Sequence, residues 1–273
     1  MIPSSQLGRT DLRISRLGFG VSGPHGLPVV SEKQTRGLIA AAYAGGVRLF
    51  DTAPFYGDAQ QRLGRALREI GTQDCALITK VGTARDGLRL IKNFGPDAVR
   101  DSVSRSLVDL HMQRIDILLL HGPPARPLEE NLRAALDGLR KEGLIGHVGV
   151  CGRGAEIAAL GEDPLVEIIQ APVWSRWPDW CAAKGLGFLG IEAMASAQSR
   201  RPWLPRSGAD LWHLARRLRH GNPPGRAAHQ HPDALLRAAL AQYGVNAVVT
   251  TTTRLAHLRA NLACANPEQR PSG

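Results

Sequence analysis

The chain has 273 residues, of which 43% are hydrophobic, 21% charged and only 5% aromatic. This composition excludes an intrinsically disordered chain, a collagen-like repeat and a small disulfide-stapled domain, and it offers ample apolar residues for a large core. The formal net charge is +10 at pH 7, so a nucleic acid, an acidic partner or a phosphorylated ligand has to be considered.

Membrane, secretory and metal classes lack their signals in the sequence. No apolar run approaches the roughly 20 residues of a membrane span, and the first residues are polar where a signal peptide needs an apolar stretch. We therefore expect a soluble, cytoplasmic protein. The cysteines are widely separated, without the paired spacing of a zinc site or a disulfide framework, so we expect free thiols and no metal site.

The positive charge is concentrated in residues 198–231. This segment holds seven arginines and one acid, Asp210, and it contributes +6 of the net charge. We interpret it as an Arg-rich excursion on the surface of a single domain that spans residues 1–273, with one helix over 209–219. A funnel for an anionic ligand is the alternative, and nucleic-acid binding is less favoured because aromatic residues are not interleaved with the basic ones.

Apolar runs typical of strands alternate with amphipathic stretches typical of helices along the whole chain. Before them, Leu7–Arg16 predicts a β-hairpin. The eight predicted strands are Leu17–Gly20, Val47–Phe50, Ala76–Thr79, Ile115–Leu120, His147–Val150, Val166–Gln170, Gly187–Ile191 and Ala247–Val249.

Helix start and stop signals lie between these runs. Ser31 and Gln34 form a capping-box pattern ahead of a helix that ends near Gly45. Further helices are predicted over Pro96–Leu110, Pro127–Gly143 and Pro232–Tyr243, because proline and acidic residues favour a first helical turn and glycine favours an end.

This alternation predicts an α/β fold, a (β/α)8 TIM barrel with an N-terminal β-hairpin, which needs about 250 residues. An open doubly wound sheet is the alternative. Gly18, Gly20 and Gly23 match its glycine-rich dinucleotide pattern, but Pro24 and Gly26 follow where the phosphate-binding helix would begin. The barrel is therefore favoured.

Three predicted strands are followed directly by an ionisable residue: Asp51, Lys80 and His121. Strand carboxyl ends share one face of a parallel barrel, so these side chains are expected to converge there. Tyr56 follows Asp51 in a short turn containing Pro54. A buried lysine beside an aspartate stays protonated and lowers a phenol pKa from about 10, which favours proton transfer by Tyr56, with His121 available to orient an oxygen.

In these motifs the sequence resembles the aldo-keto reductase superfamily, in particular its sugar and pyridoxal dehydrogenase branch. The segments that carry the resemblance are Leu7–Thr10, Ile14–Gly20, Gly46–Gly57, Thr79–Gly82 and Arg114–His121. The resemblance implies a barrel whose bottom is closed by the hairpin, a nicotinamide dinucleotide bound without a Rossmann fold, and a small-molecule carbonyl or sugar-like substrate.

The resemblance also implies roles for single residues. Tyr56 would be the general acid for carbonyl reduction, Lys80 would lower its pKa, Asp51 would pair with Lys80, and His121 would position the substrate oxygen. Hydride would pass between nicotinamide C4 and the carbonyl carbon, while the protein supplies geometry and a proton.

The nicotinamide site is expected to depart from the family pattern. Where the family commonly has Ser-Asn after the fifth strand, this chain has Cys151 and Gly152. Gln170 matches the family glutamine that contacts the carboxamide, and Trp174 lies near the aromatic that stacks on the ring, although core packing explains Trp174 equally well. A nucleophilic Cys151 is a less favoured interpretation.

The end of the chain is expected to bind the other half of the cofactor. Thr251, Thr252 and Arg254 lie where a final helix begins, a place suited to phosphate, and the resemblance implies adenine contacts for Asn261, with His257 close by. The pattern favours NADP(H), with NAD(H) as the alternative. An ordinary strand end with a helix cap also explains the threonines.

We therefore expect an NAD(P)(H)-dependent oxidoreductase that interconverts an aldehyde, ketone or sugar hemiacetal and its alcohol or oxidised product. Two alternatives stay open. One is a non-redox lyase or isomerase on the same barrel, and the other is a binding protein that senses the cofactor without turnover. No oligomeric state follows from the sequence.

Overall fold

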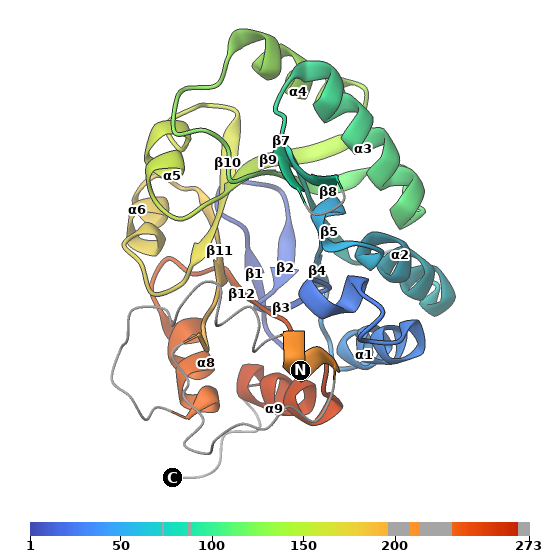
Figure 1. Ribbon diagram of the computed structural model, residues 1–273. Helices are drawn as coiled ribbons and strands as arrows, with labels where there is room; N and C mark the ends of the chain where they lie inside the picture. Colours follow the sequence, from blue (N-terminus) through green and yellow to red (C-terminus); the bar gives the residue numbers. More distant parts are fainter. Residues whose placement is uncertain (73, 87–88, 196–207, 213–230, 267–273) are drawn as a thin grey trace.

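Eight parallel strands close into a barrel in the computed structural model of the chain, in the order β10-β11-β12-β3-β4-β5-β8-β9, with the helices outside it (Figure 1). The structure describes residues 1–72, 74–86, 89–195, 208–212 and 231–266. The predicted (β/α)8 TIM barrel is confirmed, and the open doubly wound sheet is excluded.

The barrel strands coincide with the predicted apolar runs, with small shifts at their ends. They are β3 (Leu17–Gly20), β4 (Leu49–Asp51), β5 (Ala76–Val81), β8 (Ile115–His121), β9 (Ile145–Cys151), β10 (Val166–Pro172), β11 (Gly187–Ile191) and β12 (Ala247–Thr250). The prediction was wrong about the start of β4, because the Val47 N–H donates to the Ala42 carbonyl at the end of the preceding helix. The strand begins at Leu49 and includes Asp51.

Side chains along each strand alternate between two cores. On β8, Ile117 and Leu119 belong to the cluster inside the barrel, whereas Leu118 and Leu120 belong to the larger cluster between the barrel and the helices. Apolar residues on both faces explain why the strand sequences read as continuous apolar runs, as is typical of parallel sheets.

The N-terminal hairpin closes the bottom of the barrel. It starts earlier than predicted, with β1 (Ser4–Gln6), and its second strand is β2 (Arg13–Ser15). Leu7, which follows β1, and Ile14, in β2, are fully buried in the inner cluster. Gly8 has a φ of +53°, and a Cβ there would lie 2.2 Å from the Gly187 nitrogen at the start of β11. Only glycine lets the hairpin pack this closely.

The helices are α1 (Glu32–Ala44), α2 (Ala59–Ile70), α3 (Pro96–Leu110), α4 (Glu130–Lys141), α5 (Ala155–Leu160), α6 (Trp177–Ala183), α8 (Pro232–Ala241) and α9 (Leu255–Ala265). Ser31 caps α1 as predicted by accepting from the Gln34 N–H, but the Gln34 side chain donates to the Thr253 carbonyl instead of returning to the cap. The fourth helix begins at Glu130, later than predicted, and α8 ends at Ala241.

Smaller elements lie over the top of the barrel. Two 3-10 turns, η1 (Gly23–Gly26) and η2 (Pro54–Tyr56), follow β3 and β4, and a second hairpin, β6 (Thr83–Asp86) and β7 (Arg89–Lys92), follows β5. The sequence analysis did not predict this hairpin, nor helices α2, α5 and α6.

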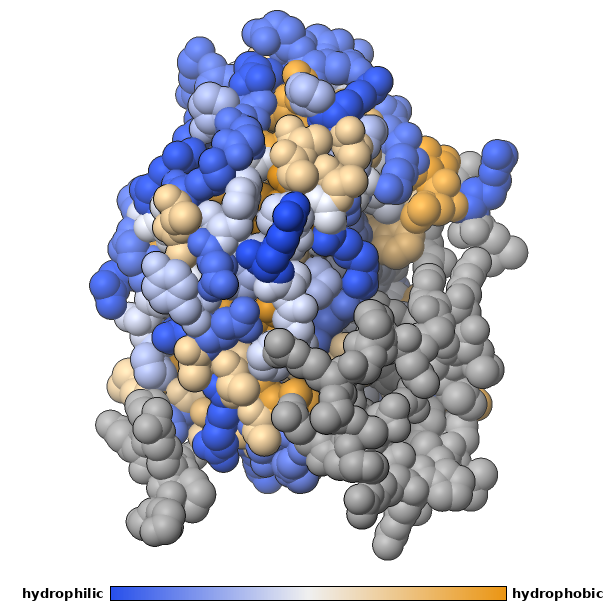
Figure 2. All heavy atoms as spheres, turned by 90° about the vertical axis from the view of Figure 1, so that its left-hand side faces the viewer, coloured by the Kyte–Doolittle hydropathy of each residue, from blue (hydrophilic) through white to orange (hydrophobic). Residues whose placement is uncertain are grey.

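Most of the Arg-rich segment 198–231 lies outside the described residues. Of the helix predicted over 209–219, the structure shows residues 208–212 as helical, and the rest of that prediction lies outside the described part of the chain. The face shown in Figure 2 is mostly hydrophilic, with small hydrophobic areas. None of the helices in the described ranges is long and apolar enough to cross a membrane.

Candidate active site

The carboxyl ends of β4, β5 and β8 bring three of the predicted residues to one rim of the barrel. These strands are neighbours in the barrel; Asp51 ends β4, Lys80 is the penultimate residue of β5, and His121 ends β8. The turn η2, which begins three residues after Asp51, carries Tyr56 back to the same rim. The expected convergence of the four side chains is therefore present in the fold.

A buried ion pair lies at the centre of this rim. Lys80 Nζ donates to Asp51 Oδ1 at 2.6 Å and to the Thr52 carbonyl at 3.1 Å, and the Lys80 and Asp51 side chains are only 1% and 7% exposed. Gln170, from β10, donates from Nε2 to the same Asp51 oxygen at 3.2 Å. Asp51 thus joins residues from three strands in one buried network.

Lys80 also lies beside the ring of Tyr56, with Nζ 5.4 Å from the ring centroid. Burial opposes the charge of Lys80, but attraction to Asp51, Tyr56 and Cys151 outweighs burial and raises the pKa of Lys80. The lysine is consequently a permanent cation next to the phenol.

His121 also lies beside the ring of Tyr56. Its ring centroid lies 6.1 Å from that of Tyr56 and 6.0 Å from that of Phe55, both in edge-on geometry. Burial, followed by repulsion from Lys80 and Lys92, lowers the pKa of His121 to about 3. The imidazole is therefore neutral near pH 7, and its Nδ1 is buried without a hydrogen-bond partner among the described residues.

In the loop after β9, a neighbouring side chain lies close to Gly152. A Cβ at Gly152 would lie 2.4 Å from Cγ of Glu156. The Glu156 carboxylate accepts from the backbone N–H groups of Arg153 and Gly154, at 2.7 and 3.3 Å. Glu156 thus fills the space that a side chain at position 152 would occupy.

Cys151 lies near Lys80 and Asp51 but is a poor nucleophile. Burial raises the pKa of its thiol to about 11, although the positive charge of Lys80 opposes the shift. A thiol with this pKa is almost entirely protonated at neutral pH, and the thiolate is the reactive form. The burial of the Cys151 thiol and its raised pKa argue against the nucleophile interpretation.

Gln170 lies in β10, and Trp174 follows the end of this strand. Gln170 is 1% exposed, and its amide nitrogen is engaged by Asp51. Trp174 is half-buried and donates from its indole Nε1 to the Ala193 carbonyl at 2.8 Å. The contacts of both residues with nicotinamide stay predictions.

The loop between β12 and α9 is held by the segment after β3. His25 Nε2 lies 3.0 Å from the Thr252 carbonyl, and Gln34 donates to the Thr253 carbonyl at 2.7 Å. Thr251 pairs through its hydroxyl with Ser22 at 3.1 Å. The threonines therefore have structural contacts, and their binding of phosphate stays a prediction.

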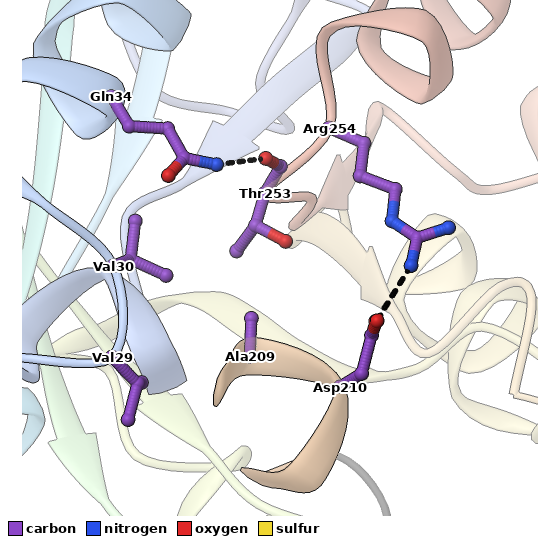
Figure 3. Close-up of a pocket in the computed structure, with 7 residues that line it drawn as sticks. All are labelled: Val29, Val30, Gln34, Ala209, Asp210, Thr253 and Arg254. Atoms are coloured by element: carbon purple, nitrogen blue, oxygen red, sulfur yellow. Dashed lines mark hydrogen bonds and ion pairs between the residues drawn. The ribbon is translucent and has the colours of Figure 1, made fainter. Parts of the chain in front are cut away.

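Three more predicted residues lie on or next to α9. His257 is exposed. Asn261 is 5% exposed and donates to the Thr250 hydroxyl at 3.3 Å, so its amide supports the end of β12. Arg254 precedes the helix and pairs with Asp210 (Figure 3). The sequence analysis noted Asp210 as the one acid in an Arg-rich segment but did not predict this contact.

No cluster of three or more histidine, cysteine or acidic side chains suited to a metal ion occurs in the ranges that the structure describes.

The fold and the side chains at this rim define the class of the protein. It is a (β/α)8-barrel protein with ionisable side chains gathered at the carboxyl end of the barrel. The model of the Aldo/keto reductase family matches residues 16–168, which is more than half of the chain. The chain therefore belongs to the aldo/keto reductase family.

Comparisons with known proteins agree with this placement. The chain is 31% identical to L-galactose dehydrogenase of Arabidopsis thaliana over 159 residues, 54% of this chain and 47% of that protein. It is 32% identical to NADH-specific methylglyoxal reductase of Escherichia coli over 189 residues, 60% of this chain and 57% of that protein. The matches thus span about half the length of these curated relatives.

Among solved structures, a putative aldo-keto reductase from Pseudomonas aeruginosa is similar, with a TM-score of 0.74 and 28% identity over 96% of this chain and 94% of the other. The similarity to a solved structure extends over nearly the whole barrel.

Proposed function

We propose that this protein is an NAD(P)(H)-dependent oxidoreductase that interconverts a carbonyl group and its alcohol or oxidised product. The observation that carries the proposal is the arrangement at the barrel rim: Tyr56 lies beside the buried Lys80–Asp51 pair and beside a neutral His121. Family membership supports the same reaction class.

Proton transfer is assigned to Tyr56. The attraction that raises the pKa of Lys80 acts in both directions, so the ammonium stabilises the tyrosinate that forms when Tyr56 gives its proton to a developing alkoxide. Asp51 holds the ammonium in place at 2.6 Å. Because His121 is neutral, it orients the substrate oxygen through a hydrogen bond without adding a second positive charge to the rim.

The residues present fit a nicotinamide dinucleotide. The orphaned Nδ1 of His121 marks unsatisfied polar capacity at the rim, and a pocket of about 340 Å³ lies beside Arg254, within the size range of ligand sites. Gln170 and Trp174 would hold the nicotinamide end, and the loop before α9 would hold the phosphate end. The cofactor supplies or accepts the hydride.

The substrate proposed is an aldehyde, a ketone or a sugar hemiacetal. The compounds in the names of two relatives, a galactose dehydrogenase and a methylglyoxal reductase, belong to this range.

The test compares Tyr56→Phe with Tyr43→Phe. Tyr43 lies on α1, where its hydroxyl contacts Asp74, so its replacement removes a phenol oxygen away from the rim. We expect Tyr56→Phe to lower kcat for reduction of a carbonyl panel by about 100-fold or more while nucleotide binding is kept, and Tyr43→Phe to leave kcat unchanged. Full turnover by Tyr56→Phe would refute the assignment.

One observation favours a second candidate, a non-redox lyase or isomerase. Glu156 fills the space where the family carries a side chain that holds the carboxamide. In that case Tyr56, with Lys80 and His121 beside it, would transfer protons without any hydride transfer. Product formation without any nicotinamide nucleotide would favour this candidate, and strict dependence on the nucleotide would exclude it.

A further inference from the structure

The pocket beside Arg254 is formed by three segments that are distant in the sequence. Its lining includes Val29 and Gln34 from the segment around the start of α1, Ala209 and Asp210 from the helical residues 208–212, and Arg254 (Figure 3). Among the described residues that line it, Arg254 is the one cation and Asp210 the one anion. The charges of these two residues balance each other.

Asp210 and Arg254 form a close ion pair on one side of this pocket. Arg254 Nη2 donates to both carboxylate oxygens of Asp210, at 2.7 and 2.9 Å. The Asp210 side chain is only 6% exposed, whereas that of Arg254 is 46% exposed. The guanidinium thus faces the pocket with its charge already compensated by a buried carboxylate.

Packing holds Asp210 in this position. A Cβ at Gly208 would lie 3.0 Å from Cβ of Val29, and one at Gly23 would lie 2.7 Å from the ring of Trp212. Both ends of the helical residues 208–212 are therefore in close contact with the segment around η1. That segment also holds the loop ahead of Arg254, through the hydrogen bond from Gln34 to Thr253.

This geometry treats the two nicotinamide cofactors differently. A 2′-phosphate carries a charge of about −1.5 to −2, and at Arg254 it would lie next to the Asp210 carboxylate. Drawing Arg254 toward the phosphate would weaken its two hydrogen bonds to a buried carboxylate, and weakening a buried ion pair is destabilising. A ribose 2′-hydroxyl adds no charge and donates a hydrogen bond to a carboxylate. Acidic residues in NAD sites accept a hydrogen bond of this kind.

We propose that Asp210 is a specificity-determining residue that selects NAD(H) over NADP(H). The inference rests on the proposed function, and it reverses the preference expected from the sequence, where Arg254 was considered without its partner 44 residues earlier in the chain.

The test measures the Kd of NADH and of NADPH by calorimetry for the full chain and its variants, so that its readout is independent of turnover. In the unmodified protein we expect NADH to bind at least about tenfold more tightly than NADPH, because like charges brought together weaken binding by this order or more. Asp210→Asn should lower the Kd of NADPH about tenfold, and Asp210→Glu should keep the NADH preference.

A matched control is available at the other end of the barrel. Asp163 precedes β10, its side chain is also 6% exposed, and it pairs with both terminal nitrogens of Arg133. Asp163→Asn removes the same buried charge away from the pocket and should leave the ratio of the two Kd values unchanged. Adding Arg254→Ala to Asp210→Asn should abolish the gain in NADPH affinity.

The results separate the two proposals. Equal Kd values, tighter NADPH binding by the unmodified protein, or an unchanged ratio in Asp210→Asn would overturn the assignment of Asp210 and leave the oxidoreductase proposal in place. If the folded protein binds neither nucleotide, the proposed function itself is wrong, and the selectivity falls with it.

Discussion

Removing the charge of Asp51 tests whether the rim depends on a buried ion pair. Asp51→Asn keeps the size of the side chain and an oxygen that can accept from Lys80, but it removes the negative charge that pairs with this lysine, whose side chain is 1% exposed. Breaking a buried pair by removing one partner costs about 3–5 kcal/mol. We therefore expect the free energy of unfolding to fall by about this amount, a large part of the roughly 5–15 kcal/mol that stabilises a domain.

Urea unfolding followed by circular dichroism measures this loss. The double variant Asp51→Asn/Lys80→Met removes both charges and should recover most of the stability, so the two changes are expected to be coupled. Glu69→Gln is the control, because its pair with Arg36 is 52% and 40% exposed and should contribute less than about 1 kcal/mol. A loss below about 1 kcal/mol in Asp51→Asn, with no coupling to Lys80, would refute the reasoning.

Two further predictions concern the bottom and the rim of the barrel. His147 hydrogen-bonds Glu167 at 2.9 Å and Asp11 at 2.7 Å, and these bonds raise the pKa of His147 above 6.5. The stabilising contribution of His147 should be complete below pH 6.5 and lost as the pH rises through the raised pKa. The urea midpoint of the unmodified protein should therefore fall across this pH range, and this fall should be absent in His147→Asn. Gly26→Ala places a Cβ 1.5 Å from the Tyr56 carbonyl oxygen, so thermal melts should show about 1–3 kcal/mol of destabilisation or more, with turnover lost through displacement of Tyr56. Unchanged melting and activity would contradict this contact.

The sequence determined the barrel and the residues at its rim through local patterns. Apolar runs separated by helix signals were sufficient for the eight strands, because strands buried on both faces have nearly continuous apolar sequences. The positions of Asp51, Lys80 and His121 followed from one topological rule, since the carboxyl ends of parallel strands meet at one face. Tyr56 followed because only a short turn separates it from Asp51.

Helix boundaries and the loop contacts were less predictable. Gln34 had the spacing of a capping box, yet its side chain donates to Thr253, on a loop at the far end of the sequence. The sequence analysis noted only that Gly152 lacks the expected side chain. The fold shows that Glu156 occupies the space where that side chain would lie. In the first case a carbonyl from a distant segment takes a polar group for which a local partner was expected. In the second case a side chain four residues further along the chain fills the space beside the glycine.

The charge balance at Arg254 was decided by the tertiary structure alone. The sequence placed positive charge ahead of the last helix, but the carboxylate that compensates it is 44 residues away and approaches through the packing of residues 208–212 against η1 and Val29. Periodicity and capping signals report on neighbours within a few residues. Electrostatic compensation depends on distance in space, and only the folded chain brings Asp210 to Arg254.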